Sequence, residues 1–352
     1  MIQIETRLPS FNGLRAISIL LVLLSHLSLQ NKLFSEVEKN QVLKPFFIFL
    51  HDGQLGVNVF FVISGFLITS VLLKEETISK RISLKRFYLK RILRIFPAYY
   101  FLLGVYFLLQ MFDFFQISNF SWLTSLTFTK NFYWFSDPYT SHLWSISVEE
   151  IFYLLWPLLF ILGNKQRKAI AFLIIFMVFA TKIFFQSYYS NFVWASELTI
   201  FTRVDAIATG CLFALYKNEL LQMFSKYWRT LFYSSLTLLF LSRSFPEIMK
   251  NSEINTFWIE MNSSIVNLFI AILMMYSVFG PKKSWYRVLN TKVFNYIGLL
   301  SYSLYLWQQF FIQSTRHWFN SVPINLVLLF LVAIASYHLI EKPFLKWKEK
   351  IT

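Results

Sequence analysis

The sequence predicts an all-α polytopic membrane protein with about ten transmembrane helices and both termini in the cytoplasm. Of its 352 residues, 56% are hydrophobic and only 14% are charged, whereas soluble globular chains carry about 25% charged residues. Apolar stretches near the length that crosses a bilayer, about 20 residues, recur along the chain. The 20% aromatic content argues against disorder, and the single Cys211 excludes a disulfide-stapled secreted module.

Ten apolar segments are candidate spans. They cover residues 14–30, 54–74, 91–112, 143–162, 168–186, 197–216, 229–242, 262–280, 293–313 and 322–341. The first could be mistaken for a signal peptide, but it contains Arg15 and His26 and no small-x-small cleavage site follows Leu29. We therefore expect it to be retained. Neither a repeat nor a soluble appendage stands out, so we expect residues 1–352 to form a single membrane-embedded domain.

Basic residues predict the orientation of these spans. With the N-terminus inside, 23 of the 33 Lys and Arg residues fall in cytoplasmic segments, seven fall outside and three lie within spans. Cytoplasmic loops of membrane proteins carry such an excess of Lys and Arg. The same asymmetry accounts for the net charge of +15, so we predict a lipid bilayer and no nucleic acid among the partners.

Arg15 and His26 lie on one stripe of the first predicted helix. Eleven helical steps return to within about 20° of the starting direction and advance about 16 Å. Arg15 would lie near the cytoplasmic end and His26 in the outer half of the membrane. An anion arriving from the cytoplasm could meet Arg15 while its reactive end reaches His26. A hydrogen-bonded packing role for the histidine is the plain alternative.

Carboxylates and a further arginine lie in the fourth and sixth spans. Charged groups in hydrocarbon are costly, so an intramembrane ionisable residue is a functional hypothesis, although structural ion pairs are the alternative. Residues two apart on a helix do not face each other, so Arg203 and Asp205 should find separate partners. We expect one outer-half polar layer that contains His26, Glu149, Glu150, Arg203 and Asp205, with His142 and Ser147 as supporting residues.

The loop between the second and third spans is the densest basic stretch. Arg86, Lys90, Arg91 and Arg94 recur at helical intervals from this loop into the start of the third span. Such residues signal topology at an anionic leaflet, and a cationic helix end also suits a polyphosphate ligand. In the second span, Ser64 and Gly65 are small residues that allow close helix approach or a local break of the helix. The five His show no HxxxH or HExxH spacing, so we expect no metal and no tightly bound cofactor.

Seven blocks in order resemble the acyltransferase-3 family of integral membrane O-acyltransferases. They are LPSFNGLRAISILLVLLSHL, GVNVFFVISGFLI, RFYLKRILRIFPAYY, SHLWSISVEEIFYL, FTRVDAIATG, YIGLLSYSLYLW and SYHLIEKPF. The chain departs from the family pattern at Asn12, Asn58 and Gln308, positions that bear on acceptor preference. The separate extracytoplasmic esterase-like domain fused to some members is not expected here.

The resemblance implies transfer of an acyl group, usually acetyl, from cytoplasmic acyl-CoA to a hydroxyl of an extracytoplasmic glycan or glycolipid, such as a polysaccharide or lipopolysaccharide. It also implies a multi-pass protein of a cell membrane, the inner or plasma membrane of a bacterium. The donor would be held by Arg15 and the basic block, while His26, Glu149 and Glu150 would be catalytic. A His suits a base for the acceptor hydroxyl near neutral pH. Whether His26 acts only as a base or also carries the acyl group is open.

Two alternatives come from other classes of protein. A secondary transporter or glycolipid flippase would also need intramembrane His and Glu, but it predicts inverted repeats and broken helices in matching halves. A non-catalytic membrane scaffold predicts scattered ionisable residues instead of a shared layer. The sequence shows neither pattern.

Overall fold

The computed structural model describes residues 8–28, 40, 42–132, 137–188, 199–248, 252–313 and 318–351. Every regular element within these ranges is a helix, which confirms the all-α class. The chain folds as two compact units. Unit 1 comprises Met1–Val71, Lys165–Ala195 and Phe201–Leu299, and unit 2 comprises Leu72–Asn164, Ser196–Ile200 and Leu300–Thr352. Helices α4 and α15 divide between the two units, and α8 and α10 each have their first one or two residues in unit 2.

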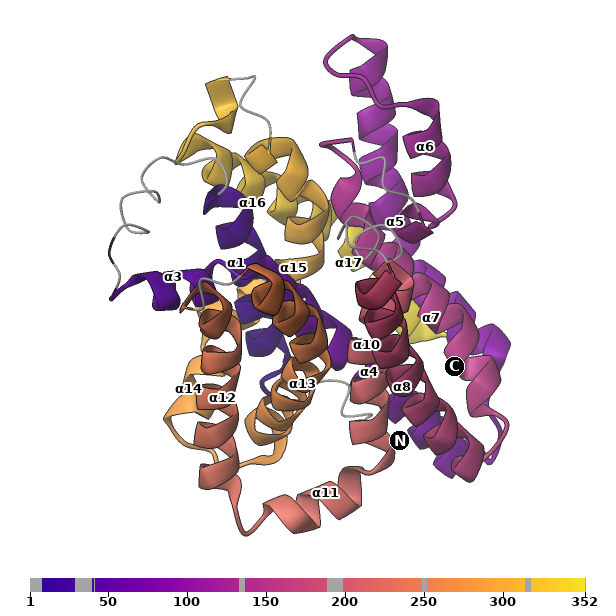
Figure 1. Ribbon diagram of the computed structural model, residues 1–352. Coiled ribbons are helices and arrows are strands. Elements are labelled where there is room, and N and C mark those ends of the chain that lie inside the picture. Colours follow the sequence, from indigo (N-terminus) through magenta and orange to yellow (C-terminus); the bar gives the residue numbers. More distant parts are fainter. Residues whose placement is uncertain are drawn as a thin grey trace. The chain divides into compact units, whose positions relative to one another are not determined.

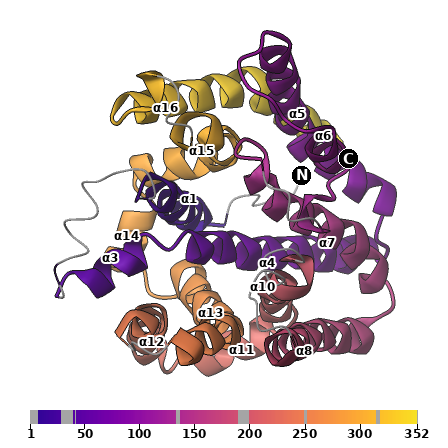
Figure 2. The same cartoon turned by 45° about the horizontal axis from the view of Figure 1, so that its top comes forward.

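Unit 1 is a bundle of long helices with short connecting ones. Its elements are α1 (Phe11–Ser28), α3 (Lys44–Leu50), most of α4 (Gly53–Ser79), α8 (Asn164–Tyr188), α10 (Thr199–Leu215), α11 (Lys217–Phe224), α12 (Trp228–Ile248), α13 (Ser252–Phe279), α14 (Ser284–Leu289) and the first part of α15 (Lys292–Gln308). Helix α12 lies along α13 and also contacts α3 (Figures 1 and 2). Asp52, in the turn between α3 and α4, forms an ion pair with Arg243 of α12.

Two glycines set the crossing of α4 and α10 in unit 1. A Cβ on Gly65 would lie 1.9 Å from the carbonyl oxygen of Ile207, and one on Gly210 would lie 2.1 Å from that of Val62. Any larger residue would therefore force the two backbones apart. The predicted close approach at Gly65 is confirmed, and it is the small-residue packing common between membrane helices. Ser64 lies beside it on α4, half-buried.

Unit 2 collects the middle and the end of the chain. Its elements are the end of α4, α5 (Leu84–Met111), α6 (Asn119–Leu126), η1 (Lys130–Phe132), η2 (Ser141–Leu143), α7 (Trp144–Phe160), the rest of α15, the π-helix η3 (Gln309–Gln313), η4 (Trp318–Asn320), α16 (Ile324–Ser336), the π-helix η5 (Tyr337–Glu341) and α17 (Lys342–Lys350). Helix α5 begins where the Ser83 hydroxyl accepts a hydrogen bond from the Arg86 amide, as an N-cap does. Further along, α5 packs against η5 and α17.

Six helical segments in the described ranges are long and apolar enough to cross a membrane. They are Phe11–Ser28, Gly53–Ser79, Leu84–Met111, Ser141–Phe160, Asn262–Phe279 and Ile324–Lys350. Each of the ten predicted spans coincides with a helix in its described part. Apolar side chains such as Phe172, Phe176 and Phe107 are exposed on these helices, as suits contact with lipid. The count of ten crossings and the cytoplasmic termini stay predictions, as does the single domain.

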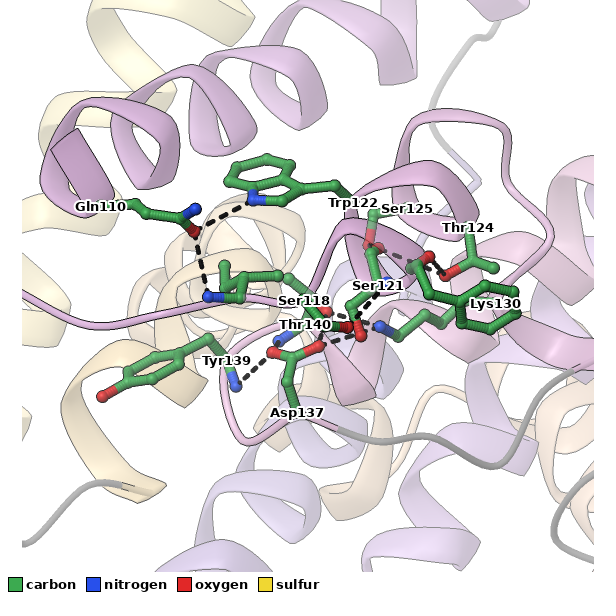
Figure 3. Close-up of polar contacts among 12 residues, drawn as sticks. Gln110, Ser118, Ser121, Trp122, Thr124, Ser125, Lys130, Asp137, Tyr139 and Thr140 are labelled. Atoms are coloured by element: carbon green, nitrogen blue, oxygen red, sulfur yellow. Dashed lines mark hydrogen bonds and ion pairs between the residues drawn. The ribbon is translucent and has the colours of Figure 1, made fainter.

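A network of buried hydrogen bonds and one ion pair connects residues of the segment between α6 and α7, outside the spanning helices (Figure 3). The Lys130 ammonium, 4% exposed, lies 3.0 Å from Asp137 Oδ2 and 2.6 Å from Thr140 Oγ1. Asp137 also accepts hydrogen bonds from the backbone amides of Tyr139 and Thr140. Burial by itself would raise the pKa of Asp137, but the Lys130 ion pair and the Thr140 hydrogen bonds outweigh it, so this pKa is lowered.

Candidate active site

Unit 2 contains a buried group of charged side chains on α5, α7 and η5, which we call the arginine cluster: Arg91, Arg94, Glu149, Glu150, Tyr153 and Glu341. Arg91 donates from Nε and Nη2 to Glu150 Oε1, at 3.1 and 2.9 Å. Its guanidinium lies 3.5 Å from the centroid of the Tyr153 ring, and the Tyr153 hydroxyl donates to Glu149 Oε1 at 3.0 Å. Tyr153 therefore links Glu149 to Arg91.

Arg94 lies one turn beyond Arg91 on α5. It interacts electrostatically with Arg91, Glu149 and Glu341, yet it forms no hydrogen bond or ion pair with another residue in the described ranges. Glu341, 6% exposed, accepts a hydrogen bond from the Ser303 hydroxyl. The guanidinium donors of Arg94 are thus uncommitted in a half-buried position, where an anionic ligand would find them.

The contact between Arg91 and Glu150 corrects the depths expected from the sequence. Arg91 was expected at the cytoplasmic surface and Glu150 in the outer half of the membrane, but their side chains are 2.9 Å apart. The reason is that α5 begins at Leu84, so Arg91 lies about 10 Å inside its helix at 1.5 Å per residue. The two residues therefore share one depth, so Arg91 at the cytoplasmic surface and Glu150 in the outer half of the membrane cannot both be right.

The remaining members of the predicted donor block differ in their partners. Arg86 pairs with Glu75 across the turn between α4 and α5, and Glu75 also accepts from the Ser83 amide. Lys90, half-buried and one turn before Arg94, makes no ion pair with a residue that the structure describes. Two cations of the block are therefore neutralised within the fold, whereas Lys90 and Arg94 remain available on one helical face.

Helix α1 of unit 1 carries Arg15 and His26. The helix runs unbroken from Phe11 to Ser28, so the two residues share a face as the eleven-residue spacing requires. Both side chains are half-buried. The Nδ1 atom of His26 is buried and has no hydrogen-bond partner in the described part of the chain. An imidazole nitrogen held in this way can exchange a proton with a ligand.

A second charged group in unit 1 is the lysine cluster: Lys182 on α8, Asp205 on α10, and Ser263 and Ser264 on α13. Lys182 Nζ lies 3.3 Å from Asp205 Oδ2 and 2.6 Å from Ser263 Oγ, and the Ser264 hydroxyl donates to the same carboxylate oxygen at 2.6 Å. Asp205 thus finds its partners on other helices, as expected. Arg203, half-buried two residues earlier, is not a member.

Two predicted supporting residues have structural contacts. The Nε2 atom of buried His142 lies 3.0 Å from the carbonyl oxygen of Leu306, and the Tyr305 hydroxyl donates to the His142 carbonyl oxygen at 2.8 Å. The Ser147 hydroxyl donates to the Leu143 carbonyl oxygen within α7. These bonds tie the start of α7 to α15 and place Glu149 and Glu150.

Some members of the two clusters were not singled out from the sequence. Lys182 was only counted among the three basic residues that lie within spans, and Glu341 was only part of a family block. A carboxylate within the apolar segment 322–341 was the available signal for Glu341. Tyr153 gave no signal, because only the fold brings its ring under the Arg91 guanidinium.

Comparison with known proteins places the whole chain in one family. A family model described as an acyltransferase domain matches residues 8–339. The chain is 29% identical over 376 residues to "Putative O-acetyltransferase SACOL0978" of Staphylococcus aureus strain COL. It is equally identical over 378 residues to "O-acetyltransferase OatA" of S. aureus strain NCTC 8325. Each match covers 96% of this chain and 57% of the relative, so the chain spans little more than half the length of these relatives.

No solved structure matches the chain. The family model covers most of both units, including α1 with its Arg–His pair and every member of the arginine cluster except Glu341. The six apolar helices agree with the membrane character of the family. The chain therefore belongs to the acyltransferase-3 family of membrane acyltransferases and is a multi-pass membrane protein.

Proposed function

We propose that this protein transfers an acyl group, acetyl in the first instance, from cytoplasmic acyl-CoA to a hydroxyl of an extracytoplasmic glycan or glycolipid in the cell membrane. The observation that carries the proposal is His26, whose buried Nδ1 has no partner in the described ranges and which shares a helical face with Arg15. The names of the O-acetyltransferase relatives support the acetyl group. Membership of an acyltransferase family does not favour a transporter.

Within unit 2, the donor phosphates are assigned to Lys90 and Arg94, and the donor role of Arg15 in unit 1 stays a prediction. Arg94 and Lys90 make no ion pair with any described residue, whereas Arg86 and Arg91 are paired with Glu75 and Glu150. Charge-assisted hydrogen bonds to phosphate need donors that no carboxylate already occupies. The basic block therefore divides into two residues that bind the donor, Lys90 and Arg94, and two that form ion pairs within the fold, Arg86 and Arg91.

The transfer step assigns one role to His26. An imidazole nitrogen accepts the proton of the acceptor hydroxyl while the oxygen attacks the thioester carbonyl. The C–O bond of the ester forms, the C–S bond breaks, and the thiolate of CoA leaves and takes up the proton. Glu149 and Glu150 act on the donor side through Tyr153 and Arg91, to which they are bonded.

The test uses purified protein in lipid vesicles, radiolabelled acetyl-CoA and a glycan acceptor, and it measures label that reaches the glycan. His26→Ala should abolish the transfer and leave acetyl-CoA binding within about twofold, because the phosphate contacts are elsewhere. The matched control is His51→Ala, a histidine outside helix α1 whose ring bonds to the Phe47 carbonyl oxygen at 2.7 Å and stacks on Phe47. That variant should transfer label normally.

A folded His26→Ala protein that acylates its glycan at the normal rate would refute the proposed mechanism. Movement of a glycolipid across the vesicle membrane without acetyl-CoA, by the same protein, would instead establish the flippase alternative.

A further inference from the structure

The polar side chains of α15 divide into two groups along the helix. Near its middle, the Tyr302 hydroxyl donates to the Ile95 carbonyl oxygen at 3.0 Å, and the Tyr305 hydroxyl bonds to Ser145 and His142. At its end, Trp307 Nε1 and both amide atoms of Gln308 are buried without a hydrogen-bond partner in the described part of the chain. Gln308 is 0% exposed. Helix α15 thus satisfies these two hydroxyls, whereas the side-chain polar atoms of its last two residues have no partner in the described ranges.

Polar side chains that pack around the end of α15 also have buried atoms without a hydrogen-bond partner in the described ranges. Tyr106 of α5, 0% exposed, packs edge-on against Trp307 with ring centroids 6.5 Å apart, and its hydroxyl has no partner within the described ranges. The same holds for Oε1 of Gln309, the first residue of the π-helix η3, and for Nδ2 of Asn325 on α16, which packs against η3. Each unmade buried hydrogen bond is costly, and π-helices are frequent at functional sites.

The chemistry of these atoms indicates the ligand. The hydroxyl and the two amides donate and accept, the indole only donates, and none of the groups is charged. The absence of charge among these groups favours a neutral ligand, and a sugar offers several hydroxyls that each donate and accept. The rings of Tyr106, Trp307 and Phe310 lie together, which suits the apolar face of a sugar ring.

We propose that Tyr106, Trp307, Gln308 and Gln309 bind a carbohydrate at the junction of α15 and η3, and that this junction is the acceptor subsite. The acceptor role rests on the proposed function. Along α5, Tyr106 is twelve residues from Arg94, or about 18 Å at 1.5 Å per residue. Since α5 is predicted to run outward, the junction lies towards the extracytoplasmic end of unit 2 and Arg94 towards the cytoplasmic end.

Two tyrosines provide a matched test. Tyr106→Phe removes an unbonded hydroxyl, so it should leave Tm unchanged or raise it, while it weakens carbohydrate binding about three- to tenfold, the value of one hydrogen bond. Tyr302→Phe removes a bonded hydroxyl, so it should lower Tm and leave carbohydrate binding unchanged. Gln308→Ala, which removes two polar atoms, should weaken binding about tenfold or more.

The experiment uses equilibrium dialysis to measure the binding of tritiated chitohexaose and maltohexaose to the full chain in lipid nanodiscs. Acetyl transfer from acetyl-CoA is assayed in parallel. Binding of either hexasaccharide that falls in Tyr106→Phe and Gln308→Ala but not in Tyr302→Phe supports the subsite. No binding to the wild type, or equal binding to all variants, would overturn it. Binding that follows this pattern without acetyl transfer would refute the proposed function alone. Transfer with unaltered binding in the variants would refute the subsite alone.

Discussion

The lysine cluster of unit 1 and the arginine cluster of unit 2 bury ion pairs in different ways. In the lysine cluster, Lys182 and Asp205 have side chains only 1% and 2% exposed, and two serines complete their hydrogen bonds. In the arginine cluster, Arg91 and Glu150 are 16% and 11% exposed, and Arg94 beside them has no ion pair in the described ranges. The first is closed to a ligand, whereas the second has uncommitted donors.

This difference shows that a buried charged side chain does not by itself indicate a ligand-binding site. A buried pair that is fully hydrogen-bonded stabilises packing at best weakly, but removing one partner leaves an uncompensated charge. The uncommitted donors of Arg94 keep that residue available for substrate. We expect substitutions in the lysine cluster to affect stability and those in the arginine cluster to affect transfer.

The largest expected effect is on the lysine cluster. Asp205→Asn leaves the Lys182 ammonium buried without a counter-ion, which should lower the free energy of unfolding by about 3–5 kcal/mol. The double variant Lys182→Met, Asp205→Leu removes both charges and should recover most of that loss. Thermal unfolding in detergent micelles measures both. If the double variant is no more stable than Asp205→Asn, the cluster has a role beyond packing and the comparison fails.

The next effect is on the arginine cluster. Arg94→Gln removes the uncommitted guanidinium and should raise KM for acetyl-CoA about ten- to hundredfold, since one charge-assisted hydrogen bond contributes about 1.5–3 kcal/mol. Its Tm should change little, because no ion pair within the described ranges is broken. Arg81→Gln, at an exposed position of the preceding loop, is the control for net charge. A normal KM in folded Arg94→Gln would remove the residue from the donor site.

The two glutamates of α7 should differ within the same cluster. Glu150→Gln breaks the ion pair with Arg91, whereas Glu149→Gln keeps an oxygen that accepts from the Tyr153 hydroxyl. We expect the transfer rate of Glu150→Gln to be about tenfold below that of Glu149→Gln, a difference of about 1.4 kcal/mol. Initial rates at saturating acetyl-CoA test the order. The reverse order would show that Glu149 has the larger role in transfer.

The smallest expected effect is on the pH dependence of stability and concerns the Lys130–Asp137 ion pair. Like the lysine cluster, this pair is buried and hydrogen-bonded, but it lies outside the spans. Because the pKa of Asp137 is lowered in the folded protein, the pair adds stability above the ordinary carboxyl pKa of about 4. This stability is lost as the pH falls through the lowered folded value. The Tm of the wild type should therefore approach that of Asp137→Asn between pH 7 and pH 3. Asp113→Asn, at an exposed carboxylate, should show no such convergence, and a constant difference for Asp137→Asn would contradict the assignment.

Local patterns predicted the helices better than the charged contacts between them. The continuous α1 follows from the apolar segment around Arg15 and His26, and the close packing at Gly65 follows from small residues in α4. The partners of Arg91 did not follow, because Glu150 is 59 residues away along the chain. The start of α5 at Leu84, which moves Arg91 deeper into the helix, depended on the Ser83 cap.

The sequence by itself determined the all-α class, the membrane-spanning character, the Arg15–His26 stripe and the family. Each of these depends on composition or on spacing within one helix, where the geometry of 3.6 residues per turn leaves little freedom. Tertiary structure alone decided which charges are neutralised and which polar atoms stay unbonded. Gln308 and Tyr302 lie on one helix, but only the neighbouring α5 backbone gives Tyr302 a partner and leaves Gln308 without one in the described ranges. Hydrogen bonds extend about 3 Å, so the packing of distant segments determines them.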